Sequence, residues 1–226
     1  AYDTVRANPH IDIRFNAGVA GIEFDEFCNI IALKNGDRLK TKLVIAADSR
    51  FSATRRMAGI VTNLHDFGRT CIVCRVKLDR DHDETAYECF FYDRTLAVLP
   101  LNGRFCSVVI TIATQDDHQI LGLSADEFSR DITQRMEGRF GKMTLDTELF
   151  PYPLVGSYAQ KFTAARYALL GDAAVGMHPV TAHGFNFGLR GADTLSREVL
   201  CAHSLGLDIG TRDVLSRYDR AHRHAT

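Results

Sequence analysis

Apolar and polar residues alternate near the start of the chain, and a period of two residues is the pattern of a half-buried β-strand. The alternating segments are residues 11–15, 19–25, 30–34 and 38–46. Asn35-Gly36 lies between two of them and is a strong signal for a hairpin turn. We therefore predict a three-stranded antiparallel excursion, followed by a buried strand over the apolar residues Leu43–Ala47.

A second alternating series occupies the middle of the chain. Its predicted strands are Thr70–Leu78, Ala86–Tyr92, Thr95–Leu99 and Phe105–Ala113. Polar or glycine-containing turns, such as Pro100–Gly103, separate them. Because short connections join neighbouring strands in antiparallel order, we predict an antiparallel sheet of about four strands.

Helical periodicity begins where this series ends. Ser124 can cap a helix, and Glu127 three residues later completes a capping box. Apolar residues then recur at helical spacing as far as Met136, and Gly138 or Gly141 ends the helix. The remaining predicted elements are a strand at Tyr167–Leu170 and helices at residues 184–205 and 211–224.

The order of these elements predicts a mixed α/β (α+β) fold. Strands and helices alternate at both ends of the chain, and an antiparallel sheet with one helix is inserted between them. We expect three segments, residues 1–66, 67–150 and 151–226, of which the first and the third form one domain.

The composition fits a globular protein with a sizeable core. The chain has 226 residues, 46% of them hydrophobic, and its 27 basic and 28 acidic residues give a net charge of −1. This balance argues against nucleic-acid binding, which usually requires a basic stripe. No run approaches the roughly 18 apolar residues that a membrane span needs, and no signal peptide opens the chain. We expect a cytoplasmic protein.

Two cysteines have the spacing of a redox motif. Cys71-Ile72-Val73-Cys74 lies in a β-branched run, however, whereas a reactive pair needs its first cysteine at a helix N-terminus. We therefore predict reduced thiols in a strand. The histidine pairs His178 with His183 and His222 with His224 lack a third ligand at any recognised metal spacing, so we predict no metal site.

The most informative run is ALLGDAAVGMHPVTAHGFNFGLRGAD, residues 168–193. A strand leads there through small residues and Asp172 into a helix start at Gly184–Asn186. Helix N-termini attract electron-rich ligand atoms, the Asp172 carboxylate can accept bonds from ligand hydroxyls, and Asn186 can both donate and accept. These features suit a flavin. The alternative is an ordinary strand, cap and buried helix with Asp172 as a turn residue.

A second segment, LKTKLVIAADSRFSATRRMAGI (residues 39–60), places Asp48 after an apolar strand and before a helix start at Thr54–Met57. Together the two segments resemble the flavin-dependent aromatic hydroxylases built like p-hydroxybenzoate hydroxylase. Asp48 corresponds to the family's Asp-Gly motif, and Gly171-Asp172 corresponds to its Gly-Asp motif. The wording ADSRFSATRR and GDAAVGMHPVTAHGFNFGL is most similar to the ring hydroxylases of ubiquinone biosynthesis.

The resemblance implies a monooxygenase that uses FAD and NAD(P)H and transfers one atom of O₂, through a flavin C4a-hydroperoxide, to an aromatic ring. It favours a prenylated ubiquinone precursor as substrate. The first and third segments then form an incomplete FAD/NAD(P)-binding Rossmann-like domain, and residues 67–150 form the substrate domain. The residues assigned to the cofactor are Asp48, Gly171, Asp172, Pro179, Ala182, His183, Gly184, Phe185 and Asn186.

The chain departs from the family pattern at three positions. Ser49 stands where the Asp-Gly motif has glycine, and Ala182 and His183 stand where the flavin loop has Gly-Gln. His183 adds an ionisable ring, and we hypothesise that it holds the loop or moves a proton near the flavin. It is the one candidate catalytic side chain, because the cofactor carries the chemistry.

The family's Gly-x-Gly-x-x-Gly fingerprint is absent from the chain. We therefore expect a parent protein in which a further βαβ unit of about 30 residues completes the FAD site. A hydroxylase of a soluble phenol, an isoprenoid reductase of the same fold and a non-catalytic ligand-binding fragment stay open as alternatives. Transient contact with the inner face of the membrane, a homodimer and a hydroxylase complex also stay open; nucleic acid is not expected as a partner.

Overall fold

Two units make up the structure, a computed structural model that describes residues 2–178 and 183–223. The first unit comprises Ala1–Leu64 and Gly156–Thr226, and the second comprises His65–Val155. The chain passes from one unit to the other within two strands, β5 (Thr62–Leu78) and β10 (Phe150–Ala159). The second unit is therefore an insertion into the first, as the order of the predicted elements implies.

Two short apolar strands, β4 (Val44–Ala46) and β12 (Tyr167–Leu169), organise the first unit. They pair in parallel, although they lie far apart in the sequence, and β11 (Thr163–Ala164) extends their sheet in the order β11-β12-β4. All three residues of β12 are completely buried. A continuous apolar run of this kind is typical of parallel strands, which are covered on both faces.

A three-stranded antiparallel sheet precedes β4, as predicted. It consists of β1 (Val19–Glu23), β2 (Asn29–Leu33) and β3 (Arg38–Thr41). Gly36 has a φ of 95° in the hairpin between β2 and β3, which confirms the Asn-Gly turn. The buried amide of Asn29 donates to the carbonyl of Arg166 at 2.9 Å and so ties this sheet to the start of β12.

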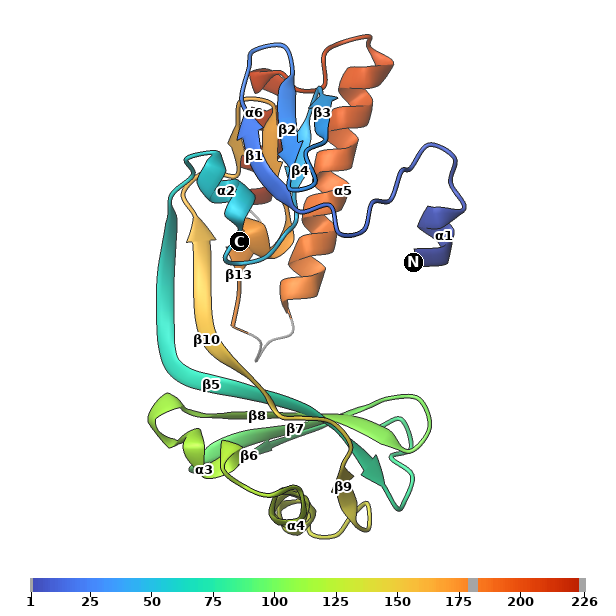
Figure 1. Cartoon of the computed structure of the whole chain (residues 1–226), viewed down its shortest axis with the longest axis vertical. Coiled ribbons are helices and arrows are strands. Elements are labelled where there is room, and N and C mark those ends of the chain that lie inside the picture. Colours follow the sequence, from blue (N-terminus) through green and yellow to red (C-terminus); the bar gives the residue numbers. More distant parts are fainter. Residues whose placement is uncertain (1, 179–182, 224–226) are drawn as a thin grey trace. The chain divides into compact units, whose positions relative to one another are not determined.

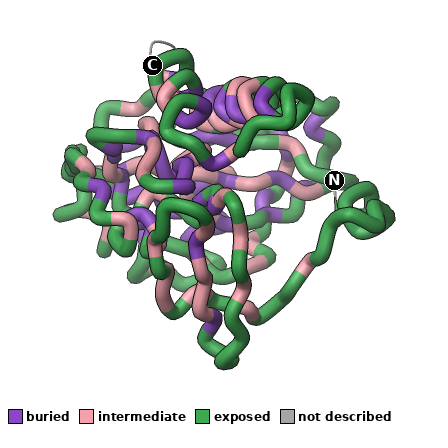
Figure 2. Tube along the Cα trace, turned by 90° about the horizontal axis from the view of Figure 1, so that it is seen from above, coloured by how far each residue is buried: buried purple, intermediate pink, exposed green. Residues whose placement is uncertain are grey.

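The predicted strand at residues 11–15 is wrong. This segment pairs with no strand among the described residues and follows a short helix, α1 (Tyr2–Arg6), in a stretch of the chain that is mostly exposed (Figure 2). Phe15 is 69% exposed and contacts only the ring of Tyr2 among the aromatic residues described. Alternation indicates which side chains can share a face, but it does not supply the partner strand that a β-strand needs.

Two helices pack on the parallel strands and complete the core of the first unit. They are α5 (His183–Ser204) and α6 (Arg212–Arg223), drawn in orange and red in Figure 1. Their side chains Phe187, Leu195, Leu215 and Tyr218 share one hydrophobic core with both parallel strands. The Tyr218 hydroxyl also donates to the carbonyl of Leu169 at 2.6 Å, which fixes α6 to the end of β12.

The second unit contains the predicted antiparallel sheet. Its strands β6 (Tyr87–Phe90), β7 (Arg94–Pro100) and β8 (Phe105–Ala113) follow β5 in the sheet order β5-β8-β7-β6, and all of these pairs are antiparallel. β8 has the predicted bounds, whereas β5 begins at Thr62 rather than at Thr70. The short strand β9 (Met143–Leu145) pairs with β5, and the full sheet continues through β10 to β13 (Val175–Gly176).

One face of this sheet is covered by helix α4 (Ala125–Arg135). Ser124 caps the helix and forms the predicted capping box with Glu127, and Gly138 follows its end with a φ of 64°. The helix side chains Phe128 and Ile132 are completely buried against the even-numbered residues of β8. The odd-numbered residues of β8 lie on the other face and stay partly exposed. A 3-10 turn (Thr114–Asp116) and a short helix, α3 (His118–Leu121), connect β8 to α4.

The two cysteines with redox spacing lie in β5, which confirms the predicted strand. Both Cys71 and Cys74 are buried thiols. Burial raises the pKa of the Cys74 thiol to about 12, so this residue stays protonated at neutral pH. A protonated thiol in a strand is a packing residue rather than a nucleophile.

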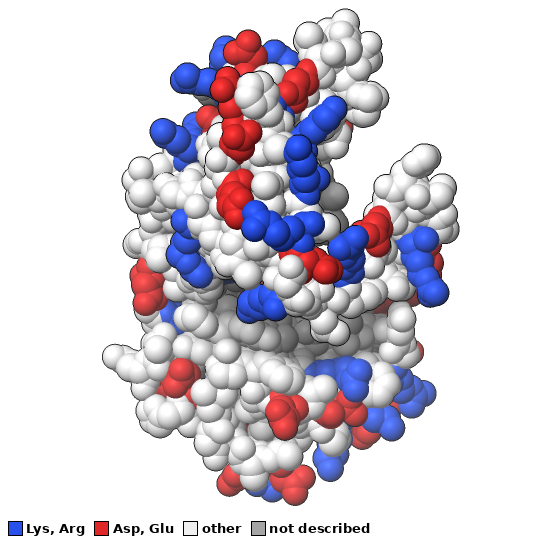
Figure 3. Space-filling model, turned by 45° about the horizontal axis from the view of Figure 1, so that its top comes forward, with Lys and Arg blue, Asp and Glu red and all other residues white. Residues whose placement is uncertain are grey.

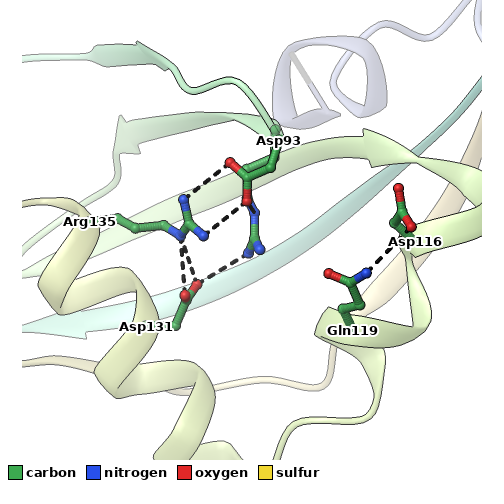
Figure 4. Close-up of polar contacts among 6 residues, drawn as sticks. Asp93, Asp116, Gln119, Asp131 and Arg135 are labelled. Carbon is green, nitrogen blue, oxygen red and sulfur yellow. Dashed lines mark hydrogen bonds and ion pairs between the residues drawn. The ribbon is translucent and has the colours of Figure 1, made fainter.

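An ion-pair network fastens α4 to β7 (Figure 4). The guanidinium of Arg94 is only 7% exposed and donates to Asp93 at 2.8 Å and to Asp131 at 3.3 Å. Arg135, one helical turn after Asp131, contacts both carboxylates. Each guanidinium therefore has two anionic partners, which offsets the cost of burying Arg94. Elsewhere, the face drawn in Figure 3 carries both signs of charge side by side.

We expect Asp131→Asn to lower the free energy of unfolding by about 1–3 kcal/mol, because Arg94 and Arg135 each lose an anionic partner. Urea unfolding followed by far-ultraviolet circular dichroism measures this, since the chain has no Trp. Asp116→Asn is the control. Asp116 accepts a bond from Gln119 at 3.4 Å away from the network, and its substitution should change stability by less than about 0.5 kcal/mol. Equal losses for both variants would contradict the assignment.

Candidate functional site

The parallel pairing of β4 and β12 places two loops at one edge of the sheet. Ala46 and Leu169 pair at the carboxyl ends of these strands. Asp48 follows the first strand, and a 3-10 turn (Gly171–Ala173) with Asp172 follows the second. Asp48 and Asp172 therefore follow adjacent parallel strands. The carboxyl edge of parallel strands is where ligands bind in open α/β sheets.

The Asp48 carboxylate is held by its own loop. It accepts the hydroxyl of Ser52 at 2.6 Å and both the backbone N–H and the hydroxyl of Thr54 at 3.3 and 3.2 Å. Burial alone would raise the pKa of Asp48, but these hydrogen bonds outweigh it and hold the pKa below its usual value. Asp48 is therefore ionised at neutral pH and fixes the start of α2 (Ala53–Met57), which Ser52 caps.

The Asp172 carboxylate is more open. Its side chain is 40% exposed and forms an ion pair with Arg50 at 3.2 Å. Gly171, directly before it, has a φ of 58°, a left-handed conformation that glycine adopts without strain. One face of this carboxylate thus meets a cation from the Asp48 loop, and the exposed part remains available to ligand hydroxyls.

The buried side chain of Arg55 links the Asp48 loop to the turn that contains Asp172. It is 4% exposed, and its guanidinium donates to the carbonyl of Ala173 at 2.6 Å and to the carbonyl of Arg50 at 2.9 Å. A planar guanidinium can bond two carbonyls in fixed directions, which a lysine cannot do. The positions of Asp172 and Arg50 are consequently set by one buried side chain.

The first turn of α5 lies against the Gly171–Ala173 turn. A Cβ atom added to Gly188 would lie 3.6 Å from the Cα of Gly171, and one added to Gly184 would lie 4.0 Å from an oxygen of Asp172. The first turn of α5 contains no acidic residue that would neutralise the positive end of the helix dipole. Asn186 is exposed beside it and can both donate and accept hydrogen bonds.

Seven of the nine expected cofactor residues thus lie on two loops and the first turn of α5: Asp48, Gly171, Asp172, His183, Gly184, Phe185 and Asn186. His183 begins α5 and is exposed, so its proposed role in the loop or in proton transfer stays a prediction. Pro179 and Ala182 lie outside the described residues.

Sequence reasoning missed the arginines of this site. Arg50 and Arg55 follow Asp48 in a short loop and helix, where an arginine is ordinarily a solvated surface residue. Ser52 gave one usable signal, because a helix that starts after it places Arg55 on its third residue, on the same side as the capping hydroxyl. The partners across the fold, at Ala173 and Asp172, could not be read from the sequence.

The arrangement offers an exposed carboxylate, a cation 3.2 Å from it and a helix start free of acidic residues. These groups fit a ligand that has hydroxyl groups next to an electron-rich or anionic part, as the ribityl chain and phosphates of FAD do. Within the described residues, no group of three or more His, Cys, Asp or Glu side chains could hold a metal ion.

We expect Arg55→Lys to lower the free energy of unfolding by about 1.5–3 kcal/mol, since the ammonium group cannot bond both carbonyls and stays buried. Thermal and urea unfolding measure the loss. Arg56→Lys is the matched control, because Arg56 is the exposed neighbour and donates to the Phe51 carbonyl of its own loop. Wild-type stability in R55K would show that the bridge contributes nothing.

Comparison with known proteins agrees with this geometry. Residues 3–224 match the FAD binding domain family. Ubiquinone hydroxylase UbiM of Neisseria meningitidis is 43% identical over 98% of this chain and 48% of its own length. The 3-demethoxyubiquinol 3-hydroxylase of Escherichia coli is 27% identical over 96% of this chain and 55% of its own length.

Solved structures share the fold at low sequence identity. PqsL of Pseudomonas aeruginosa, in complex with 2-aminobenzoylacetate, superposes with a TM-score of 0.77 at 18% identity, over 92% of this chain and 59% of its own. The chain spans about half the length of the curated relatives it matches. The family match covers nearly every residue, and the two acidic loops of the site fall within it. The chain therefore belongs to the FAD binding domain family and is similar in sequence to ubiquinone hydroxylases.

Proposed function

We propose that this chain is part of an FAD-dependent, NAD(P)H-using monooxygenase that hydroxylates the aromatic ring of a ubiquinone precursor. The observation that carries the proposal is the parallel pairing of β4 and β12, which brings the Asp48 loop and Asp172 to one edge of a sheet beside the start of α5. The ubiquinone hydroxylases of Neisseria meningitidis and Escherichia coli support the choice of substrate class.

Each group at this edge has a distinct part in holding the cofactor. The exposed oxygen of Asp172 would accept hydrogen bonds from ribityl hydroxyls, and Arg50 would keep that carboxylate oriented. The backbone N–H groups at the start of α5 would stabilise negative charge on the flavin. FAD, when bound, supplies the activation of O₂. Pro179 and Ala182 are included among the proposed cofactor residues because of their positions in the flavin loop motif.

The substrate would lie on the partly exposed face of the antiparallel sheet. Leu96 and Val98 of β7 are completely buried in the core with α4 and cannot contact a substrate. Thr95 and Ala97 of β7 pair with Thr111 and Val109 of β8 on the opposite face. On the same face Phe90 of β6 pairs with Thr95, and Glu88 pairs with Ala97. An aromatic ring would meet an exposed phenyl ring there, and the Glu88 carboxylate would disfavour a substrate that carries a negative charge.

A prenylated precursor is dissolved in the membrane, so the enzyme would have to contact the bilayer surface. In the described part of the chain, none of the helices has the length and apolar character of a membrane span. The proposal includes transient contact with the bilayer surface. A homodimer or a larger hydroxylase assembly belongs to the same proposal and is open to direct measurement of mass in solution.

We expect Asp172→Asn to weaken FAD binding by about 10- to 100-fold, equivalent to about 1.5–3 kcal/mol, because a charged acceptor of ribityl hydroxyls becomes a neutral amide. The polypeptide that carries this chain is expressed at its natural length and titrated with FAD by calorimetry. Asp193→Asn is the control, since Asp193 is an exposed carboxylate on α5 that pairs with Arg197. Wild-type affinity in D172N would remove Asp172 from the site.

Substrate class is tested in a bacterial strain that lacks ubiquinone ring hydroxylation. The same natural-length gene should restore ubiquinone, measured by mass spectrometry of extracted quinones, if the substrate is a ubiquinone precursor. Accumulation of the unhydroxylated precursor, in a strain that contains the protein with FAD bound, would favour a soluble phenol or an isoprenoid double bond instead. A protein that never binds FAD would favour the ligand-binding alternative.

A further inference from the structure

A histidine is buried inside the first unit, near the end of α6. The side chain of His222 is completely buried. Its ring stacks on Phe187 of α5, with ring centres 4.1 Å apart and an angle of 23° between the planes, and on Tyr218 of α6 at 5.5 Å and 19°. Phe162 closes a third side at 5.7 Å. Three aromatic rings thus surround the imidazole.

Neither ring nitrogen of His222 has a hydrogen-bond partner within residues 2–178 and 183–223. Buried polar groups are nearly always paired, because an unpaired one keeps the cost of leaving water without compensation. A phenyl ring would make the same stacking contacts without that cost. Packing alone therefore does not account for an imidazole at this position.

The imidazole ring also packs closely against α5 at Gly191. A Cβ atom added to Gly191 would lie 2.7 Å from Nε2 of His222, so only glycine leaves room for the ring there. Phe187, one turn earlier on α5, stands between Asn186 and Gly188, the residues that face the proposed cofactor and the Gly171 turn. One stacked pair thus links His222 to the start of α5.

The charges around His222 favour its neutral form. Burial is the largest influence and lowers its pKa; Arg190 of α5 lowers it further, and Asp219 of α6 opposes them. Arg223, the next residue, lies over the ring of Phe162 at 4.8 Å and adds a second positive group nearby. Tyr218 carries no negative charge at neutral pH, because burial raises its pKa well above the usual range, and its hydroxyl donates to the Leu169 carbonyl.

We propose that neutral His222 is a positioning residue for the start of α5, and that protonation of its ring releases this helix turn from α6. This inference rests on the proposed function in one respect, namely that the start of α5 faces the cofactor. In the stacked state the ring resists protonation, whereas in the released state it meets water and titrates near its ordinary value of about 6.5. Release is therefore favoured as the pH falls below about 6.5, and the stacked state prevails above it.

Hydrogen exchange of the chain without any cofactor tests the proposal. After correction for intrinsic exchange rates, the protection of amides 187–191 should fall about tenfold between pH 7.5 and 5.5, because a group that titrates near 6.5 only in the open state shifts opening by that factor. His222→Phe should keep the protection and lose the pH dependence. His203→Phe, at an exposed histidine of α5, should behave as the wild type.

A fall in protection that persists in His222→Phe, or a wild type without any fall, would overturn the proposal. If that variant does not fold, the nuclear magnetic resonance titration of His222 in the wild type decides instead. A midpoint below 6.5 supports the proposal, and a midpoint at or above 6.5 contradicts it. These measurements require no FAD, so their failure is distinct from a failure of the cofactor titration described above.

Discussion

Parallel pairing of two three-residue strands is the constraint on which the site depends. β4 and β12 come from distant parts of the sequence, and parallel neighbours cannot be joined by a tight turn, so a long crossover must separate them. In this chain the crossover includes the whole second unit. The pairing brings the segments after both strands to the same edge, where an acidic loop, an acidic turn and a helix start can act on one ligand.

Buried guanidinium groups secure the two ends of this short pair. At the carboxyl end, Arg55 bonds carbonyls of both loops. At the amino end, Arg166 is 5% exposed, donates to the carbonyl of Lys42 at 3.0 Å and pairs with Asp208. The Arg166 hydrogen bond lowers the pKa of Asp208 to about 2, so this ion pair persists at any pH near neutrality. A sheet with few ladder hydrogen bonds is thus braced by side chains.

The sequence predicted most strands and helices because their patterns are local. The Asn35-Gly36 hairpin, the capping box at Ser124 and the strand over Phe105–Ala113 all depend on residues close together in the chain. It also predicted both acidic loops, because their sequences resemble the motifs of the family. The roles of Arg50 and Arg55 could not be predicted, because their partners come from the far side of the crossover. The prediction of a strand at residues 11–15 was wrong for the opposite reason, since the local alternating pattern was present but no partner strand lies beside it in the described residues.

The insertion of one unit into another has a consequence for synthesis of the protein. The second unit is continuous in sequence, from His65 to Val155, and contains its own core, so the ribosome releases everything that it needs to fold before β12 exists. In the first unit β1, β2 and β3 can pair with one another early, but β4 stays without its partner until β12 emerges. During that interval the exposed apolar edge of β4 is the part of the nascent chain most open to chaperones and to mispairing.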